Sequence, residues 1–219
     1  MGEILQLKVP ESLTRQAYRV IRDQILSGKL DLHQRLTEEY FASTFNISKS
    51  PVREALNQLE AEDLVKIEPR RGAFVIDFSV KDIEEIYELR EILESAVVRN
   101  LVWDAKTAAR LREAVDRAEE YHAKGDKINY VRADAAFHFL LAQASGNSRL
   151  RKASERIHNQ AIILRHRTYE QSSEVSLKQH REILELLEAG KREEAAGKMV
   201  EHIRSVRDRL LSSMPKDEL

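Results

Sequence analysis

RLTEEYFASTFNISKSPVREALNQLEAEDLVKIEPRRGAFV, residues 35–75, decides the fold of the first part of the chain. Two short helices are predicted in it, because Thr37 can cap one that runs to Phe45 and Ser48 can cap another that tolerates Pro51 in its first turn. Asn46, between the two, suits a left-handed turn position. The second helix carries an inward stripe of apolar residues: Val52, Ala55, Leu56 and Leu59.

The same stretch ends in strand chemistry. LVKIEPRRGAFVI, residues 64–76, has two runs rich in β-branched and aromatic residues on either side of PRRG, a turn signal. Upstream, apolar residues recur at helical spacing over residues 13–25, and Gly28 can end that helix. Three helices followed by a hairpin is the element order of a winged helix-turn-helix.

From Val80 onward the pattern is helical almost to the end of the chain. Six helices are expected, at about 80–102, 107–123, 127–145, 148–170, 174–189 and 191–213, with breaks at Gly125, Gly146 and Gly190. The sequence therefore predicts a mainly α protein of two domains. A winged helix-turn-helix fills residues 1–78, and an all-α antiparallel helical bundle fills residues 79–219.

The composition limits the classes of protein to consider. The chain has 219 residues, 42% of them hydrophobic, with 7 Gly, 4 Pro and no Cys, which suits long helices and excludes disulfides and thiolate metal ligands. No apolar run reaches the roughly 20 residues of a membrane span, and the N-terminus lacks a signal-peptide pattern, so we expect a cytoplasmic protein without a membrane partner. Lys216 to Leu219 spell an endoplasmic-reticulum retention signal, which we attribute to chance.

The net charge by itself gives no indication of a nucleic-acid partner. The net charge is -1, and basic and acidic residues balance over residues 1–76. Any argument for DNA binding must therefore rest on where particular charges point.

One face of the helix that follows residue 48 is polar and partly basic. Its members recur at helical spacing away from the apolar stripe, and they are Lys49, Ser50, Arg53 and Asn57. In a helix-turn-helix, the start of the second helix meets base edges and phosphates in the major groove, where arginine suits the paired acceptors of guanine. Arg71 and Gly72 form a compact hairpin tip that can approach the DNA backbone or minor groove. The alternative is a solvated helix face.

Three histidines lie on the presumed core stripes of three separate helices. His138, His180 and His202 each face inward, and Asp134 lies one turn before His138 on the same face. Singly, each fits a core histidine bonded to a neighbour; together they leave several buried polar groups that need partners, and one metal ion would satisfy all four. Three imidazoles and one carboxylate suit zinc first, and also nickel, manganese or iron. The remaining histidines compared here are interpreted as structural or exposed: His33, His122 and His158.

Two further interpretations of such a site stay open. A metal-dependent hydrolase would use the same donors, although no convincing general base is visible and the polar helix face would go unexplained. The metal could also be purely structural, or it could itself be the signal.

Arg90 falls on an apolar stripe with Ile83, Ile86 and Val97, so its guanidinium points toward the interior. An ion pair with Glu94, one turn on, is one interpretation. The other is that Arg90 binds the carboxylate of a small effector whose other oxygens reach the metal. The run Arg165, His166 and Arg167 is not distinguishable from a surface run.

Residues 35–75 resemble the winged-helix domain of the GntR family of bacterial transcription regulators, with SKSPVREAL and the spaced LV and PRRGAFV as the specific matches. The resemblance implies operator contacts from Ser48, Lys49, Ser50, Arg53, Arg71 and Gly72. Leu32-His33 replaces a usual Pro-Gly, Asp63 replaces a usual Gly, and Lys49 stands where Arg is usual, which puts loop geometry and a bidentate guanine contact in doubt.

The second half resembles the FCD domain, the effector domain of the FadR-type branch of that family, and its six expected helices resemble the VanR-like subgroup. The family's metal ligands correspond to Asp134 and His138 in DAAFH, His180 in KQHREIL and His202 in VEHI. Arg90 corresponds to a position that lines the effector cavity. The resemblance thus implies a non-enzymatic homodimer that binds a two-fold related DNA operator and responds to a small carboxylate at a divalent transition metal.

Overall fold

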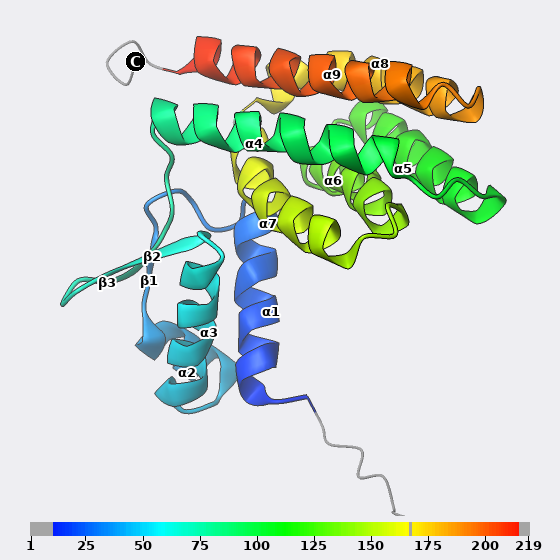
Figure 1. The fold of residues 1–219 in the computed structure, drawn as a ribbon. Coiled ribbons are helices and arrows are strands. Elements are labelled where there is room, and N and C mark those ends of the chain that lie inside the picture. The colour runs from blue at the N-terminus through cyan, green and yellow to red at the C-terminus, as the bar shows by residue number, and fades with distance from the viewer. Residues whose placement is uncertain (1–10, 167, 215–219) are drawn as a thin grey trace, which may run out of the picture. The chain divides into compact units, whose positions relative to one another are not determined.

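The computed structural model describes residues 11–166 and 168–214, apart from the side chain of Gln171, and divides into two compact units (Figure 1). The first unit extends to Ile25 and resumes from Lys29 to Ile76; the second holds residues 26–28 and those from Asp77 onward. The tetrapeptide at residues 216–219 lies outside the described residues.

The first unit has the expected order of three helices and a hairpin, which confirms the winged helix-turn-helix. Its elements are α1 (Leu13–Leu26), β1 (Arg35–Leu36), α2 (Glu38–Phe45), α3 (Lys49–Ala61), β2 (Val65–Glu68) and β3 (Gly72–Val75). The strands form an antiparallel sheet of order β1-β3-β2. The strand β1 was not predicted, because two residues are too few to show a pattern. It places Arg35 opposite Phe74 in the wing.

Local geometry explains why these residues form the helix-turn-helix. The hydroxyl of Thr37 accepts the N–H of Tyr40 at 3.2 Å and so caps α2, which ends at Asn46 in the left-handed region with φ 53°. Ser48 occupies the N-cap of α3, but its side chain makes no capping hydrogen bond there. His33 and Asp63, which stand where the resemblance expects glycine, have φ of 59° and 55°. The loops therefore keep a backbone conformation that favours glycine.

The second unit is an antiparallel bundle of six described helices. They are α4 (Val80–Arg99), α5 (Ala105–Ala123), α6 (Lys127–Ala144), α7 (Ser148–Arg165), α8 (Tyr169–Glu188) and α9 (Arg192–Ser213). Helix α6 contacts α4, α5 and α7, and α9 contacts α4 and α8. Half of the side chains of α6 are consequently buried, including Tyr130, Asp134, Phe137 and His138, and the others lie on a face that includes the exposed Arg132 and Gln143. The feature that made this segment unusual in sequence, a carboxylate and an imidazole among hydrophobic residues, thus lies inside the bundle.

Most helix boundaries of the second unit lie near the predicted positions. Gly125, Gly146 and Gly190 follow the ends of helices, as predicted, and have φ between 67° and 75°, in the left-handed region. The exception is the boundary between α7 and α8, which lies at residues 166–168 instead of near residue 172. Both the N–H and the hydroxyl of the buried Thr168 donate to the carbonyl of Arg165, so the chain leaves α7 without a glycine. None of the helices in the described part of the chain is both long and apolar enough to cross a membrane.

Candidate functional site

The polar face of α3 is exposed, and its cations are held by acidic residues of α2. The guanidinium of Arg53 donates twice to Glu38, from Nε to Oε1 and from Nη2 to Oε2, both at 2.7 Å. Lys49 Nζ lies 2.8 Å from Glu39 Oε2. The hydrogen bonds from Arg53 lower the pKa of Glu38. Because exposed ion pairs contribute little to stability, an anionic partner can take these cations over.

The other predicted contacts lie nearby within the same unit. Ser48 and Ser50 are exposed at the start of α3, and Arg71 is exposed beside Gly72 in the wing, where it pairs with Glu68. A groove of about 620 Å³ joins α3 to the wing. Its lining includes Arg35, Lys49, Arg53, Asn57 and Gly72. Arg35 was missed by the sequence analysis, since only the pairing of β1 brings it to the wing.

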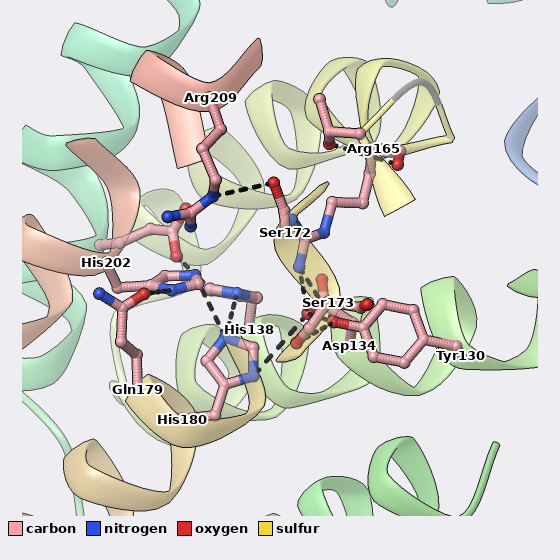
Figure 2. Close-up of polar contacts among 12 residues, drawn as sticks. Tyr130, Asp134, His138, Arg165, Ser172, Ser173, Gln179, His180, His202 and Arg209 are labelled. Carbon is pink, nitrogen blue, oxygen red and sulfur yellow. Dashed lines mark hydrogen bonds and ion pairs between the residues drawn. The ribbon is translucent and has the colours of Figure 1, made fainter. Parts of the chain in front are cut away.

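Inside the second unit, three histidines from three helices converge (Figure 2). His180 Nε2 lies 3.1 Å from His138 Nε2 and 3.2 Å from His202 Nε2. All three are buried, and the ring of Phe137 stacks on His180 with centroids 4.4 Å apart. Nitrogen ligands about 2.0–2.1 Å from a tetrahedral zinc ion lie about 3.3 Å from one another, so the observed spacing fits three ligands of one ion.

The opposite nitrogens of these rings face acceptors. His138 Nδ1 is 2.5 Å from Glu94 Oε2, and His202 Nδ1 is 3.1 Å from Gln179 Oε1. His180 Nδ1 is 3.8 Å from Asp134 Oδ1, which is beyond hydrogen-bond distance. An Nδ1–H that faces an acceptor leaves Nε2 as a lone pair in a neutral ring. The Nε2 lone pairs of His138 and His202 therefore both point at His180 Nε2, an arrangement that a cation would stabilise.

Protonation of the rings is opposed by burial. Burial lowers the pKa of His180 to about 3 and lowers that of His202 well below its ordinary value. These imidazoles are neutral at pH 7, which is the form that binds metals. They cannot relieve the convergence of their lone pairs by taking up protons near neutral pH.

Asp134 lies beside the histidines and contacts a guanidinium. Its Oδ1 is 3.2 Å from Arg165 Nη2 and 3.4 Å from the Tyr130 hydroxyl. Burial alone would raise the pKa of Asp134, but Arg165 and the imidazoles of His180 and His138 more than reverse this, so the pKa is lowered. The structure brings together possible metal ligands from His138, His180 and His202, with Asp134 next to them, and a second such group consists of Glu94, His138 and His158.

Arg90 makes the ion pair that the sequence analysis weighed against effector binding. Its Nε donates to Glu94 Oε1 at 2.7 Å, and both side chains are buried. Arg90 also lines a cavity together with Asp134, Arg165 and the histidine site. The ion pair and the cavity position are therefore compatible.

Several residues near the histidines were missed or set aside in the sequence. Glu94 and Gln179 orient the rings, and Arg165 is buried although its sequence context suggests a surface run. His158 is also buried, and its ring centroid is 4.6 Å from that of His138. Helical spacing carried one usable signal, because residues 154, 158, 161 and 165 fall on one face of α7.

Comparisons with known proteins agree with both units. Residues 13–75 match the family model for bacterial regulatory proteins of the gntR family, and residues 85–205 match the FCD domain. The uncharacterized HTH-type transcriptional regulator YdhC of Bacillus subtilis (strain 168) is 27% identical over 202 residues, 90% of each chain. The HTH-type transcriptional repressor RspR of Escherichia coli (strain K12) is 24% identical over 211 residues, 92% of this chain and 90% of RspR.

The fold is also similar to a solved structure. A GntR-type transcriptional regulator from Rhodococcus sp. RHA1 superposes with a TM-score of 0.84 at 27% identity, covering 94% of this chain and 100% of that one. The similarity extends over both the winged helix and the helical bundle.

Proposed function

Because this chain belongs to the GntR family of bacterial transcription regulators and carries an FCD domain, we propose that it is a repressor that binds a two-fold related operator as a homodimer. A small carboxylate, bound at a metal ion among the histidines of the second unit, changes its operator affinity. The repressor assignment is supported by the name of RspR, which is similar over 92% of this chain.

The observation that carries the metal assignment is the convergence of three Nε2 atoms, those of His138, His180 and His202. A zinc ion, or nickel, manganese or iron, accepts all three. Asp134 remains our candidate for the fourth protein ligand, and its contacts with Arg165 and His180 offer it a second role as a carboxylate that orients His180.

The balance of buried charge supports an anionic effector. Two guanidinium groups, Arg90 and Arg165, face two carboxylates, Glu94 and Asp134, and imidazoles that bind a metal ion do so in the neutral form and add no charge. A divalent cation would leave this buried site with an excess of two positive charges. Because an uncompensated buried charge is costly, a carboxylate is the ligand that restores neutrality, with Arg90 as its partner on α4 and Arg165 on α7.

Operator recognition is assigned to the exposed face of α3 and to the wing. Arg53 and Lys49 reach base edges or phosphates in the major groove, with Ser48 and Ser50 at the helix start. Arg71 and Gly72 contact the backbone or minor groove from the wing. Each cation exchanges its acidic neighbour in the free protein for DNA.

Regulation requires that the effector bind the DNA-competent and DNA-incompetent states with different affinities. Helix α4 is a candidate for transmitting the effect, since it carries Arg90 and Glu94 and begins shortly after β3 in the chain. We propose that effector binding alters the position of this helix.

The test combines elemental analysis with DNA footprinting on the full-length chain. We expect about one metal ion per chain, lost in His180→Ala, and operator protection that is lost in Arg53→Ala while the metal content is kept. Full metal retention in His180→Ala would remove that residue from the ligand set, and an unchanged footprint of Arg53→Ala would remove the DNA assignment.

Two outcomes would favour other functions. Operator affinity that follows metal concentration but ignores every carboxylate would identify metal as the signal. Hydrolysis of a carboxylate ester or amide that stops on chelation would identify a metal-dependent hydrolase.

A further inference from the structure

The buried face of α7 presents three polar side chains whose hydrogen-bonding capacity is not fully used. Ser154, His158 and Arg165 are 3%, 5% and 5% exposed. Ser154 Oγ, both ring nitrogens of His158 and Arg165 Nη1 make no hydrogen bond among the described residues, and His158 Nδ1 lies 3.7 Å from Glu94 Oε1, beyond hydrogen-bond distance. Buried polar atoms are nearly always satisfied in native proteins, so this strip calls for a ligand or ordered water.

Two small cavities flank His158. The lining of one includes Arg90, Arg165, Asp134, His138 and His202. The other is lined by Ser154, Glu94 and apolar side chains that include Val97, Phe139 and Met199. His138 and His158 line both cavities. Each has a volume of about 10 Å³, room for about one water molecule, so any larger ligand must be short and must push side chains apart.

The charges of the two cavities differ. The first is lined by both guanidinium groups and by one carboxylate, Asp134, so positive charge is in excess there and suits a further carboxylate. In the second, Glu94 is the charged residue of the lining, and it accepts from Arg90 Nε at 2.7 Å. A second carboxylate there would meet an ionised one. A neutral hydroxyl, which can both donate and accept, would instead find Ser154 Oγ and the ring nitrogens of His158.

We infer that Ser154 and His158 form a hydroxyl-binding subsite, and that the effector is a short hydroxy-monocarboxylate whose carboxylate lies toward Arg90 and Arg165. This inference rests on the proposed function, and it adds the polar group that the effector must carry at its other end.

A second cation in the same place is less well supported. Glu94, His138 and His158 could offer one ligand atom each to an ion. However, Glu94 already accepts from Arg90 and from His138 Nδ1, and such an ion would have to displace the latter bond. A metal stoichiometry of two, reduced to one in His158→Leu, would overturn our inference.

The test is a calorimetric titration of the zinc-loaded full-length protein with three-carbon acids. Propanoate lacks a hydroxyl, 2-hydroxypropanoate and 3-hydroxypropanoate carry one, and malonate carries a second carboxylate. We expect at least one hydroxy acid to bind tenfold or more tightly than propanoate, and malonate to bind more weakly than that hydroxy acid. In Ser154→Ala and His158→Leu the hydroxyl preference should fall to within about threefold, with zinc content retained. Lys152→Ala, on the exposed face of α7, is the matched control and should keep the full preference.

The outcomes separate the two proposals. If propanoate binds and a hydroxyl adds nothing, or if malonate binds best, the hydroxyl subsite is wrong and the carboxylate sensor stands. If both variants keep the wild-type preference, the hydroxyl is bound elsewhere and the subsite is again wrong. If the zinc-loaded protein binds none of the four acids, the proposed effector function fails, and the subsite fails with it.

Discussion

Gln179 allows a direct test of whether an acceptor at His202 Nδ1 keeps His202 Nε2 free to bind a metal ion. Its Oε1 faces His202 Nδ1 at 3.1 Å, and the side chain is only half-buried, so its removal leaves no unpaired buried charge. Gln179→Met removes the acceptor while keeping a similar volume. The proton of His202 is then free to move to Nε2, which would occupy the lone pair that the metal needs.

The expected loss of zinc affinity in Gln179→Met can be estimated from the loss of one neutral hydrogen bond. Such a bond contributes about 1 kcal/mol net, which corresponds to roughly a fivefold change in an equilibrium constant. Loss of a side chain that orients a metal ligand typically lowers metal affinity about 10- to 100-fold. Because Gln179 is half-buried, we expect Gln179→Met to lower the zinc affinity about tenfold, the lower end of that range. Gln179→Glu retains an acceptor and should bind metal at least as well as the wild type.

The assay is competition for zinc against a chromophoric chelator at pH 7. Gln143→Met is the matched control, since Gln143 is an exposed glutamine that accepts from Arg110 on the surface of the bundle. If Gln179→Met binds zinc within twofold of the wild type while His202→Ala has lost it, the tautomer argument is wrong. An equal loss in Gln143→Met would show that the effect is not specific to the site.

Three further predictions follow from the same contacts. Glu38→Gln removes the partner of Arg53 and should raise operator affinity by no more than about fivefold in fluorescence anisotropy; a decrease would mean that the pair orients Arg53 for DNA. The metal-free protein should lose stability as pH falls from about 6.5 to 4.5. The pKa values of His158 and His180 in the folded protein are about 4 and 3, below the value of about 6.5 for histidine in the unfolded chain. The unfolded state therefore takes up more protons over this pH range, which favours unfolding. The loss is on the order of 2 kcal/mol per histidine at pH 5, and denaturant unfolding that is equal at pH 7 and pH 5 would contradict it. Arg165→Met should destabilise the fold by about 3–5 kcal/mol by leaving Asp134 without its guanidinium, and adding Asp134→Asn should recover part of that; urea unfolding that shows no recovery would mean that the lost stability does not come from the ion pair.

Local signals were sufficient for the winged helix because that unit is specified by neighbours in sequence. Thr37, Asn46 and the apolar stripe of α3 act within a few residues of their own positions, and each has the conformation that the sequence predicts. The strand β1 could not be predicted from local signals, because its pairing partner is β3, nearly forty residues away in the chain. The α7–α8 boundary escaped because Thr168, not a glycine, ends the helix.

The histidines could be found from sequence because each falls on the inward stripe of its own helix, and helical periodicity tells which face is buried. Periodicity does not tell which buried faces meet. Glu94, Gln179, His158 and Arg165 come from α4, α7 and α8, and their contacts with the histidines depend on how the helices pack. The sequence by itself therefore determined the two domains, the recognition helix and the three histidines, which are encoded by short-range spacing. Only the tertiary structure decided how the rings are oriented, what Asp134 contacts and which polar atoms of α7 are left unpaired, because burial and charge pairing are set by residues that are distant in the chain.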